Sequence, residues 1–384
     1  MTAATPDWID ALAGQAVQTP AFVYSMAEIA SQMRALQAAL STPLLAVVAA
    51  CNNPDVLARL PEDVRFGARC ASRFEMNIVS AWKSEHLYLG MPALDAPSAR
   101  AVLGGRYKLI IDTPAQLEML VQLRGARHVT PVTLSLASSL AHGPAPGASS
   151  GAGLQGMDHD ALAQTLELAR RHGVAIGGLQ MHAGRHCFGR HGQAVARCLL
   201  ELVPWVEAQL GQPLQTVNLG GGLEEDWWAH AHDFAAYRRL LSGFAPHVQP
   251  MHEPGRAILA AAGVFLTRVV ATKRVAGQAV AVCDGGLVQA QALTRANPHW
   301  RGTPPRVQRG EAFATCHAAT ATTGSGQGTL IAGASAGEDD LLAHCEESLQ
   351  AGDLLAFTGA GAYVQSRSPT HFLGHPPAHA YVRA

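Results

Sequence analysis

Three glycines follow one apolar segment of this sequence, and an acid and a base follow the next. Val217-Asn-Leu-Gly-Gly-Gly222 ends in Gly220, Gly221 and Gly222, whose backbone amides can approach a phosphate closely. Met251-His-Glu-Pro-Gly-Arg256 supplies Glu253, Gly255 and Arg256. A carboxylate suits a protonated ring nitrogen and a guanidinium suits an anion, so these motifs predict a site for a molecule that carries both.

Two other motifs could add to this site. Met181-His-Ala-Gly184 places the imidazole of His182 at the end of a further apolar segment. Gly361-Ala-Tyr363 offers a hydroxyl donor from a distant part of the chain. Each motif alone has an ordinary structural explanation, since glycines usually form turns and a single histidine is usually a satisfied polar residue. The hypothesis depends on their occurring together at successive strand ends.

The elements that must position these residues alternate between short apolar segments and helix-like segments. The predicted strands are 19–24, 44–49, 65–72 with its turn, 86–89, 108–111, 132–136, 178–182, 216–219 and 248–252. Helices are predicted at 25–40, 54–60, from 73, 114–123, 160–172, 193–210 and 233–244. About eight repeats of a strand and a helix favour a closed parallel (β/α)8 barrel of the TIM type, with chemistry at the carboxyl ends of the strands.

The pattern changes after residue 258. Segments 264–270, 278–283, 330–332, 353–357 and 380–382 read as strands separated by Gly/Pro loops, which is typical of a mainly antiparallel β domain. We therefore predict an N-terminal strand (1–25) that joins the β domain, a barrel (26–258) and a C-terminal β domain (259–384). The Gly-, Ala-, Ser- and Pro-rich stretch 144–156 is predicted to be a surface loop.

The composition limits the possible partners. A formal net charge of −1 over 384 residues, without a basic run, argues against nucleic acid and membrane surfaces as partners. The N-terminus lacks a signal-peptide pattern, no apolar stretch is long enough to span a membrane, and seven cysteines show no paired spacing. We expect a cytoplasmic protein with a large core.

The motifs, in this order, resemble the fold type III pyridoxal-phosphate enzymes of the ornithine and diaminopimelate decarboxylase group. Further similarity is carried by Thr19-Pro-Ala-Phe-Val-Tyr24, Cys70-Ala-Ser-Arg-Phe-Glu75 and Val282-Cys-Asp-Gly-Gly286. The tail 361–376 is most similar to the branch that acts on siderophore precursors or carrier-linked intermediates. The resemblance implies a homodimer and a small amino-acid-like substrate, and a decarboxylase rather than a more distantly related amino-acid racemase.

The resemblance also implies roles for individual residues. Glu253 would keep the pyridine nitrogen of pyridoxal 5'-phosphate protonated, so that the ring can accept electrons. His182 would stack on the face of the ring. The phosphate would be held by residues of several motifs: Gly220, Gly221, Gly222, Gly255, Arg256 and Tyr363.

One position departs from the family pattern at the centre of the chemistry. The family's Schiff-base lysine lies five residues before the proline that follows the first barrel strand, and here that position is Ala49. A methyl group can neither hold the cofactor covalently nor carry a proton. None of Lys83, Lys108 and Lys273 lies in a suitable context. Ala49 is either an engineered replacement of lysine that traps a bound species, or a natural change in a homologue that binds the cofactor non-covalently or has a new role.

Three further departures concern neighbouring functions. The family's β-domain cysteine position is Ala336, which leaves the adjacent Ser335, a much weaker acid, as the nearest candidate proton donor. Arg69 replaces an acidic residue, and Arg185 stands where a small hydroxyl residue usually contacts phosphate. Arg185 could bind that phosphate or a substrate carboxylate, which would suggest an acidic substrate.

A second class of site is suggested by nitrogen and sulfur ligands close together in the sequence. His182, His186, Cys187 and His191 could hold a metal ion or a haem. With 18 histidines in the chain, chance clustering is the simpler explanation, so no metal is predicted.

Overall fold

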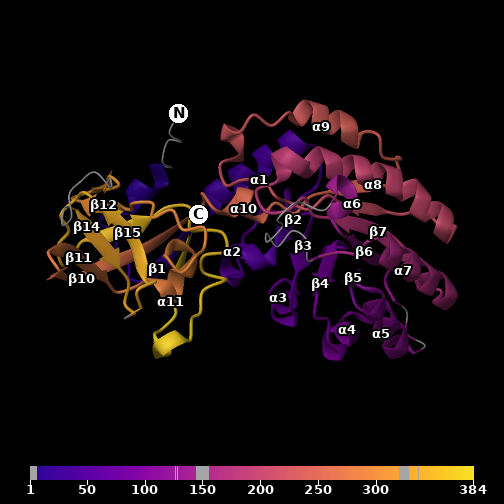
Figure 1. The fold of residues 1–384 in the computed structure, drawn as a ribbon, viewed down its shortest axis with the longest axis horizontal. Coiled ribbons are helices and arrows are strands. Elements are labelled where there is room, and N and C mark those ends of the chain that lie inside the picture. The colour runs from indigo at the N-terminus through magenta and orange to yellow at the C-terminus, as the bar shows by residue number, and fades with distance from the viewer. Residues whose placement is uncertain (1–6, 126, 128, 144–154, 320–327, 336) are drawn as a thin grey trace. The chain divides into compact units, whose positions relative to one another are not determined.

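The structure is a computed structural model that describes residues 7–125, 127, 129–143, 155–319, 328–335 and 337–384 (Figure 1). The chain divides into two compact units. One is Ala30–Ile258, and the other joins Met1–Ile29 to Leu259–Ala384. Within the described ranges, no helix has both the length and the apolar character needed to cross a membrane.

Eight parallel strands in sequential order form the sheet of Ala30–Ile258. They are β2 (Leu45–Val47), β3 (Gly67–Cys70), β4 (Leu87–Gly90), β5 (Tyr107–Ile111), β6 (Val132–Leu136), β7 (Ile176–Met181), β8 (Thr216–Asn218) and β9 (Gln249–Met251). A parallel bridge between Leu44 and His252 brings the two edges together, and the Leu45 amide donates to the His252 carbonyl at 2.7 Å. The predicted TIM-like barrel is confirmed.

Helices connect the strands and lie outside the ring that they form (Figure 1). They are α1 (Met26–Leu40), α2 (Pro54–Ala58), α3 (Arg73–Ile78), α4 (Ala96–Val102), α5 (Pro114–Arg124), α6 (Ser139–His142), α7 (His159–His172), α8 (Phe188–Leu210), α9 (Phe234–Leu241) and α10 (Gly255–Leu259). Polar caps set several starts: Asn53 accepts from the Asp55 and Val56 amides before α2, and Asp158 accepts from the Ala161 amide before α7. These caps fix where each strand-to-helix loop ends.

The interior of the barrel is filled by large side chains. Leu45, Tyr88, Ile110 and Met251 form one buried cluster, and Phe66 packs against it. They come from β2, β4, β5 and β9, so the lumen is a packed core and the ends of the strands remain for chemistry.

The other unit contains a nine-stranded, mainly antiparallel sheet. Its strands are β1 (Ala21–Ser25), β10 (Gly263–Val275), β11 (Gln278–Cys283), β12 (Arg306–Arg309), β13 (Ala312–Thr315), β14 (Thr329–Ala332), β15 (Leu341–Cys345), β16 (Leu354–Phe357) and β17 (His379–Arg383). The N-terminal strand β1 lies between β10 and β17. The predicted β domain is confirmed.

Several predicted boundaries are wrong. Strand β2 ends at Val47, and the 3-10 turn η2 (Val48–Ala50) follows, because an apolar run cannot by itself distinguish a strand from a buried turn. Strand β10 extends to Val275, and β12, β13, β15 and α4 were not predicted. Most of the predicted loop 144–156 lies outside the described residues.

Candidate active site at the carboxyl ends of the barrel strands

The predicted site residues of the barrel lie directly after successive parallel strands. His182 follows β7, Gly220 to Gly222 follow β8, Glu253 follows β9, and Ala49 lies in η2 after β2. The carboxyl ends of parallel strands point to the same side of a sheet, so all of these residues lie at one end of the barrel.

The carboxylate of Glu253 is nearly buried and is held by two neighbours. Asn218 Nδ2 donates to Glu253 Oε2 at 3.2 Å, and Arg69 Nε lies 4.0 Å from the same oxygen. The side chain of Glu253 is only 9% exposed. Asn218 also accepts from the Gly220 amide at 2.9 Å, so one amide side chain fixes both the carboxylate and the glycine turn.

His182 is a neutral imidazole beside this carboxylate. The Gly184 amide donates to Nδ1 at 2.9 Å, which assigns the ring proton to Nε2. Burial lowers the pKa of His182; Glu253 raises that pKa and Arg69 lowers it. Because burial dominates, the ring stays uncharged near neutral pH and can pack against an aromatic cofactor without adding charge.

The glycine turn packs too closely against its neighbours for any larger residue. Gly220 has φ 68°, and a Cβ there would lie 2.9 Å from His182 Cα. A Cβ on Gly221 would lie 2.6 Å from the Glu253 carbonyl oxygen, and one on Gly222 would lie 2.5 Å from the Gly184 carbonyl oxygen. The three glycines therefore bring the ends of β7, β8 and β9 together, which places backbone amides beside His182 and Glu253.

Arg69 belongs to the same cluster, although the sequence analysis did not include it in the site. Its Nη1 donates to the carbonyls of Cys70 and Gly90 at 2.6 and 3.0 Å. Its Nε is buried and has no hydrogen-bond partner among the described residues. The site therefore contains a cation that can never lose its proton, next to Glu253.

The two lysines of the barrel unit, Lys83 and Lys108, do not lie where the family resemblance would put a Schiff-base lysine. Lys83 is exposed before β4. Lys108 is the second residue of β5 and therefore lies toward the opposite end of the barrel, with its Nζ 5.8 Å from the centre of the Tyr88 ring. Lys273 is exposed on β10, in the other unit. Neither lysine of the barrel unit therefore offers an amine in place of Ala49.

The remaining predicted site residues are less closely associated. Arg256 lies in the first turn of α10, three residues after Glu253, and the Gly255 amide donates to the Glu253 carbonyl at 3.1 Å. Arg185 is exposed. Tyr363, with φ 62°, and Ser335 belong to the β-sheet unit, and Ala336 lies outside the described residues. The roles of these and of the other predicted site residues stay predictions.

The alternative metal or haem ligands do not form a common site. His186 Nδ1 lies 3.7 Å from Glu225, the His191 ring stacks on His142 with centroids 4.2 Å apart, and Cys187 Sγ contacts the Arg185 carbonyl at 3.2 Å. The described residues bring together two other groups of metal-ligating side chains: Glu224, His230 and His232, and Cys316, Cys345 and Glu347.

The fold and the site define a class of protein: an α/β barrel that holds a phosphate-bearing ring cofactor at the carboxyl ends of its strands. Residues 26–260 match the family described as "Pyridoxal-dependent decarboxylase, pyridoxal binding domain". The chain belongs to this family, and the cofactor of its matched domain is pyridoxal 5'-phosphate.

Curated relatives agree with this assignment, and solved structures share the fold. The diaminopimelate decarboxylase of Streptomyces coelicolor is 25% identical over 380 residues, which cover 92% of this chain and 82% of the relative. An L-glutamyl-[BtrI acyl-carrier protein] decarboxylase of Niallia circulans is 29% identical over 42% of this chain and 39% of its own length. The fold is similar to that of the Vibrio vulnificus lysine/ornithine decarboxylase complexed with putrescine, with a TM-score of 0.78 at 19% identity and coverage of 98% and 97%.

The residues of this barrel fit pyridoxal 5'-phosphate in all but one respect. A nearly buried carboxylate for the ring nitrogen, a neutral imidazole for the ring face and a turn with no room for a Cβ are all present. Ala49 offers no amine for covalent attachment.

Proposed function

We propose that this protein binds pyridoxal 5'-phosphate non-covalently at the carboxyl ends of its barrel strands, and that its substrate is an amino acid or an amino-acid-derived biosynthetic intermediate. The observation that carries the proposal is the contact of Gly220 with His182 and of Gly221 with Glu253, on a barrel in which position 49 is alanine. Such a protein decarboxylates its substrate poorly or not at all until an amine is supplied.

The cofactor, when bound, supplies an electron sink for the electron pair left on the α-carbon as the carboxylate group departs as carbon dioxide. In the proposed arrangement, Glu253 Oε2 would hold a proton at the ring nitrogen, fixed in place by Asn218. His182 would lie against the ring, kept uncharged by its burial. Backbone amides of Gly220 to Gly222 and the guanidinium of Arg256 would bind the phosphate.

Arg69 supports the natural rather than the engineered origin of Ala49. Val47 on β2 pairs with Arg69 on β3, and η2, which carries Ala49, contacts β3. A lysine at position 49 would therefore stand near a permanent cation, which disfavours its own charged form. An isolated engineered replacement would leave the acidic residue that the family often has at position 69.

The experiment compares covalent and non-covalent binding in three proteins. The natural chain, Ala49→Lys and the double variant Ala49→Lys/Arg69→Asp are titrated with pyridoxal 5'-phosphate, reduced with borohydride, denatured and weighed by mass spectrometry. We expect saturable binding without a covalent adduct in the natural chain, and an adduct in the double variant. Glu253→Gln serves as the binding control and should weaken the natural chain's affinity.

Two results would contradict the proposal. Failure of the natural chain to bind the cofactor at micromolar concentration would remove the non-covalent site. Unchanged affinity in Glu253→Gln would show that the cofactor binds elsewhere. Release of carbon dioxide from a substrate by the double variant, but not by the natural chain, would support the proposal that the site is built for decarboxylation.

The substrate class rests on the relatives and on Arg185. Relatives named for diaminopimelate and for a glutamyl group on an acyl-carrier protein both act on carboxylate-bearing molecules. The exposed guanidinium of Arg185 would suit such a second carboxylate or a carrier-linked substrate in a siderophore or other natural-product pathway. Carbon dioxide release by the double variant from free diaminopimelate, ornithine and arginine, and from carrier-linked glutamate, distinguishes these possibilities.

The proposal includes a homodimer, which the family resemblance implies. Sedimentation equilibrium of the purified chain should give twice the mass of one 40.3 kDa chain. A monomer at all concentrations tested would contradict this part of the proposal without affecting cofactor binding by the barrel.

A further inference from the structure

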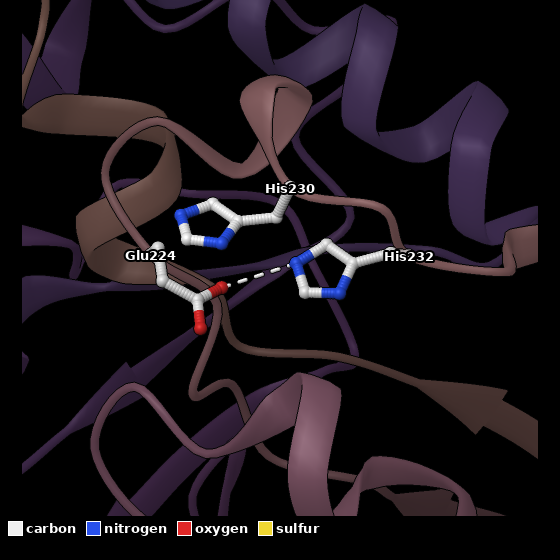
Figure 2. Close-up of side chains that lie close together, drawn as sticks. All are labelled: Glu224, His230 and His232. Atoms are coloured by element: carbon white, nitrogen blue, oxygen red, sulfur yellow. Dashed lines mark hydrogen bonds and ion pairs between the residues drawn. The ribbon is translucent and has the colours of Figure 1, made fainter.

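The loop after the glycine turn gathers two imidazoles and a carboxylate. Residues 223–233 connect Gly222 to α9 and contain the 3-10 turn η4 (Trp227–Ala229). Glu224, His230 and His232 each present a ligand atom, and these atoms all lie within 4.8 Å of one another (Figure 2). His232 Nε2 lies 3.1 Å from Glu224 Oε2.

We propose that Glu224, His230 and His232 bind a divalent first-row transition-metal ion such as Zn²⁺. Imidazole nitrogen and carboxylate oxygen together suit such ions, whereas a site made of oxygens alone would favour magnesium or calcium. Three protein ligands leave a coordination position for water. The site shares no residue with those assigned to pyridoxal 5'-phosphate.

A carboxylate behind His230 orients that ring. Asp226 Oδ1 lies 3.0 Å from His230 Nε2, so this nitrogen is engaged and Nδ1 is the one left for an ion. Figure 2 shows the His230 ring facing Glu224 and His232. Metal-ligating histidines usually donate their second ring N–H to such a partner, which fixes the tautomer and makes the ligating nitrogen more basic.

Packing holds His232 in place before any ion arrives. Its side chain is 7% exposed, and its ring meets Phe188 and Phe234 edge to face, with centroids 5.4 and 5.5 Å away. A Cβ at Gly189 would lie 3.1 Å from His232 Cε1, so the start of α8 also confines the ring. Little side-chain freedom remains to be lost when an ion binds.

A second carboxylate lies beside the cluster. Glu225 Oε2 is buried, has no hydrogen-bond partner among the described residues, and lies 3.7 Å from His186 Nδ1. A cation bound at Glu224, the adjacent residue, would also be attracted by this carboxylate.

The competing explanation is two separate hydrogen-bonded pairs, Glu224 with His232 and Asp226 with His230. The test uses metal-stripped full-length protein titrated with ZnCl2 by calorimetry, and with CoCl2 by visible absorption, which reports coordination geometry. The variants are Glu224→Gln and His232→Asn. The matched control is His247→Asn, which removes a histidine whose Nε2 pairs with Glu207 at 2.8 Å outside the cluster.

We expect wild type and His247→Asn each to bind one equivalent of Zn²⁺ at this site. His232→Asn and Glu224→Gln should lose this equivalent or bind it at least about tenfold more weakly. Asp226→Asn should lower the affinity for this Zn²⁺ ion roughly 10–100-fold, the usual effect of removing a residue that orients a ligating histidine. Zn²⁺ should raise the thermal midpoint of wild type and leave that of His232→Asn unchanged. Circular dichroism checks that each variant is folded, and Glu224→Gln keeps the size of the original side chain.

An equivalent held by Cys316, Cys345 and Glu347 would persist in His232→Asn and would show sulfur-to-cobalt absorption. The proposal therefore concerns only the equivalent that substitution at the histidine cluster removes. Equal Zn²⁺ binding by wild type and by both cluster variants overturns the proposal. An equal loss in His247→Asn overturns it too, because binding would then depend on surface histidines in general.

Discussion

Lowering the pH should destabilise this protein through a single buried histidine at the closure of the barrel. His252 is 0% exposed, with Nδ1 2.7 Å from Thr42 Oγ1 and Nε2 3.0 Å from the Tyr237 hydroxyl. Burial lowers its pKa from 6.5 to about 3. Its backbone joins the first and last strands of the barrel through Leu44 and Leu45, so a charge on this ring would be introduced where the sheet closes.

The sign and size of the effect follow from that difference in pKa. Above pH 6.5 the ring is neutral in both the folded and the unfolded chain, so His252 adds no pH dependence. Below pH 6.5 His252 binds a proton in the unfolded chain but not in the folded chain. The free energy of unfolding therefore falls with pH until the pH reaches the pKa of the folded state. Each pH unit in this range lowers the free energy of unfolding by about 1.36 kcal/mol, so a change from pH 6.5 to about 4.5 lowers it by roughly 2.7 kcal/mol.

The assay is urea unfolding of wild type and His252→Gln at about pH 7.5 and pH 4.5. Glutamine can keep one of the two hydrogen bonds but cannot titrate, and the other histidines contribute equally to both proteins. Between the two pH values, the free energy of unfolding of wild type should fall by roughly 2.7 kcal/mol more than that of the variant. An equal loss in both proteins, or a His252 ring signal that titrates above pH 5 by NMR, would refute the reasoning.

Three further predictions concern the cofactor site. Gly220→Ala should displace His182 and cost about 1–3 kcal/mol in urea unfolding, more than Gly211→Ala, whose φ of 66° is similar but whose surroundings are open. Asn218→Ala removes a hydrogen bond to the Glu253 carboxylate and should weaken cofactor binding about tenfold, measured by titration with pyridoxal 5'-phosphate; unchanged affinity would show that Asn218 does not position the carboxylate. Glu253→Gln should lower the pKa of His182 further, because it removes the carboxylate that raises that pKa; an NMR titration that moves upward would disprove this.

The central part of the site could be predicted because the direction of the parallel strands determines where its residues lie. Once β7, β8 and β9 are recognised as parallel neighbours, residues immediately after them must lie at the same end of the barrel. His182, Gly220 and Glu253 were found in this way, and the structure brings His182 and Glu253 against the glycine turn. No knowledge of side-chain conformation was needed for that step.

Asn218 and Arg69 were missed as site residues for a different reason. Their roles depend on side chains that reach across from one strand to another, and such contacts leave no periodic signal in a sequence. Asn218 did carry a hint, since it is a polar residue in the otherwise apolar segment that leads to the glycines. The position of Arg69 was noted only as a departure from the family, and its 4.0 Å approach to Glu253 emerges from the folded barrel.

The metal ligands show how closeness in sequence can mislead. His182 and His191 are nine residues apart, but α8 begins at Phe188 and directs His191 toward His142. Glu224 and His232 are eight residues apart, and the turn η4 between them brings their side chains within 3.1 Å. The start of a helix can direct side chains that are close in sequence away from one another, whereas a compact turn can bring such side chains together. Sequence spacing alone does not distinguish the two cases.

Ala49 and Arg69 together suggest how a site can keep its charge while losing its nucleophile. A lysine at position 49 would contribute a cation and, when deprotonated, an amine that attacks a carbonyl carbon. Arg69, on the adjacent strand, contributes a cation near Glu253 but cannot give up its proton. In the proposed protein, Arg69 would supply the charge that a lysine at position 49 contributes, and neither lysine of the barrel unit would supply the amine. A cation beside a lysine at position 49 would favour the neutral, nucleophilic form of its amine, so Ala49→Lys alone should already form a borohydride-reducible adduct with the cofactor, without the added Arg69→Asp.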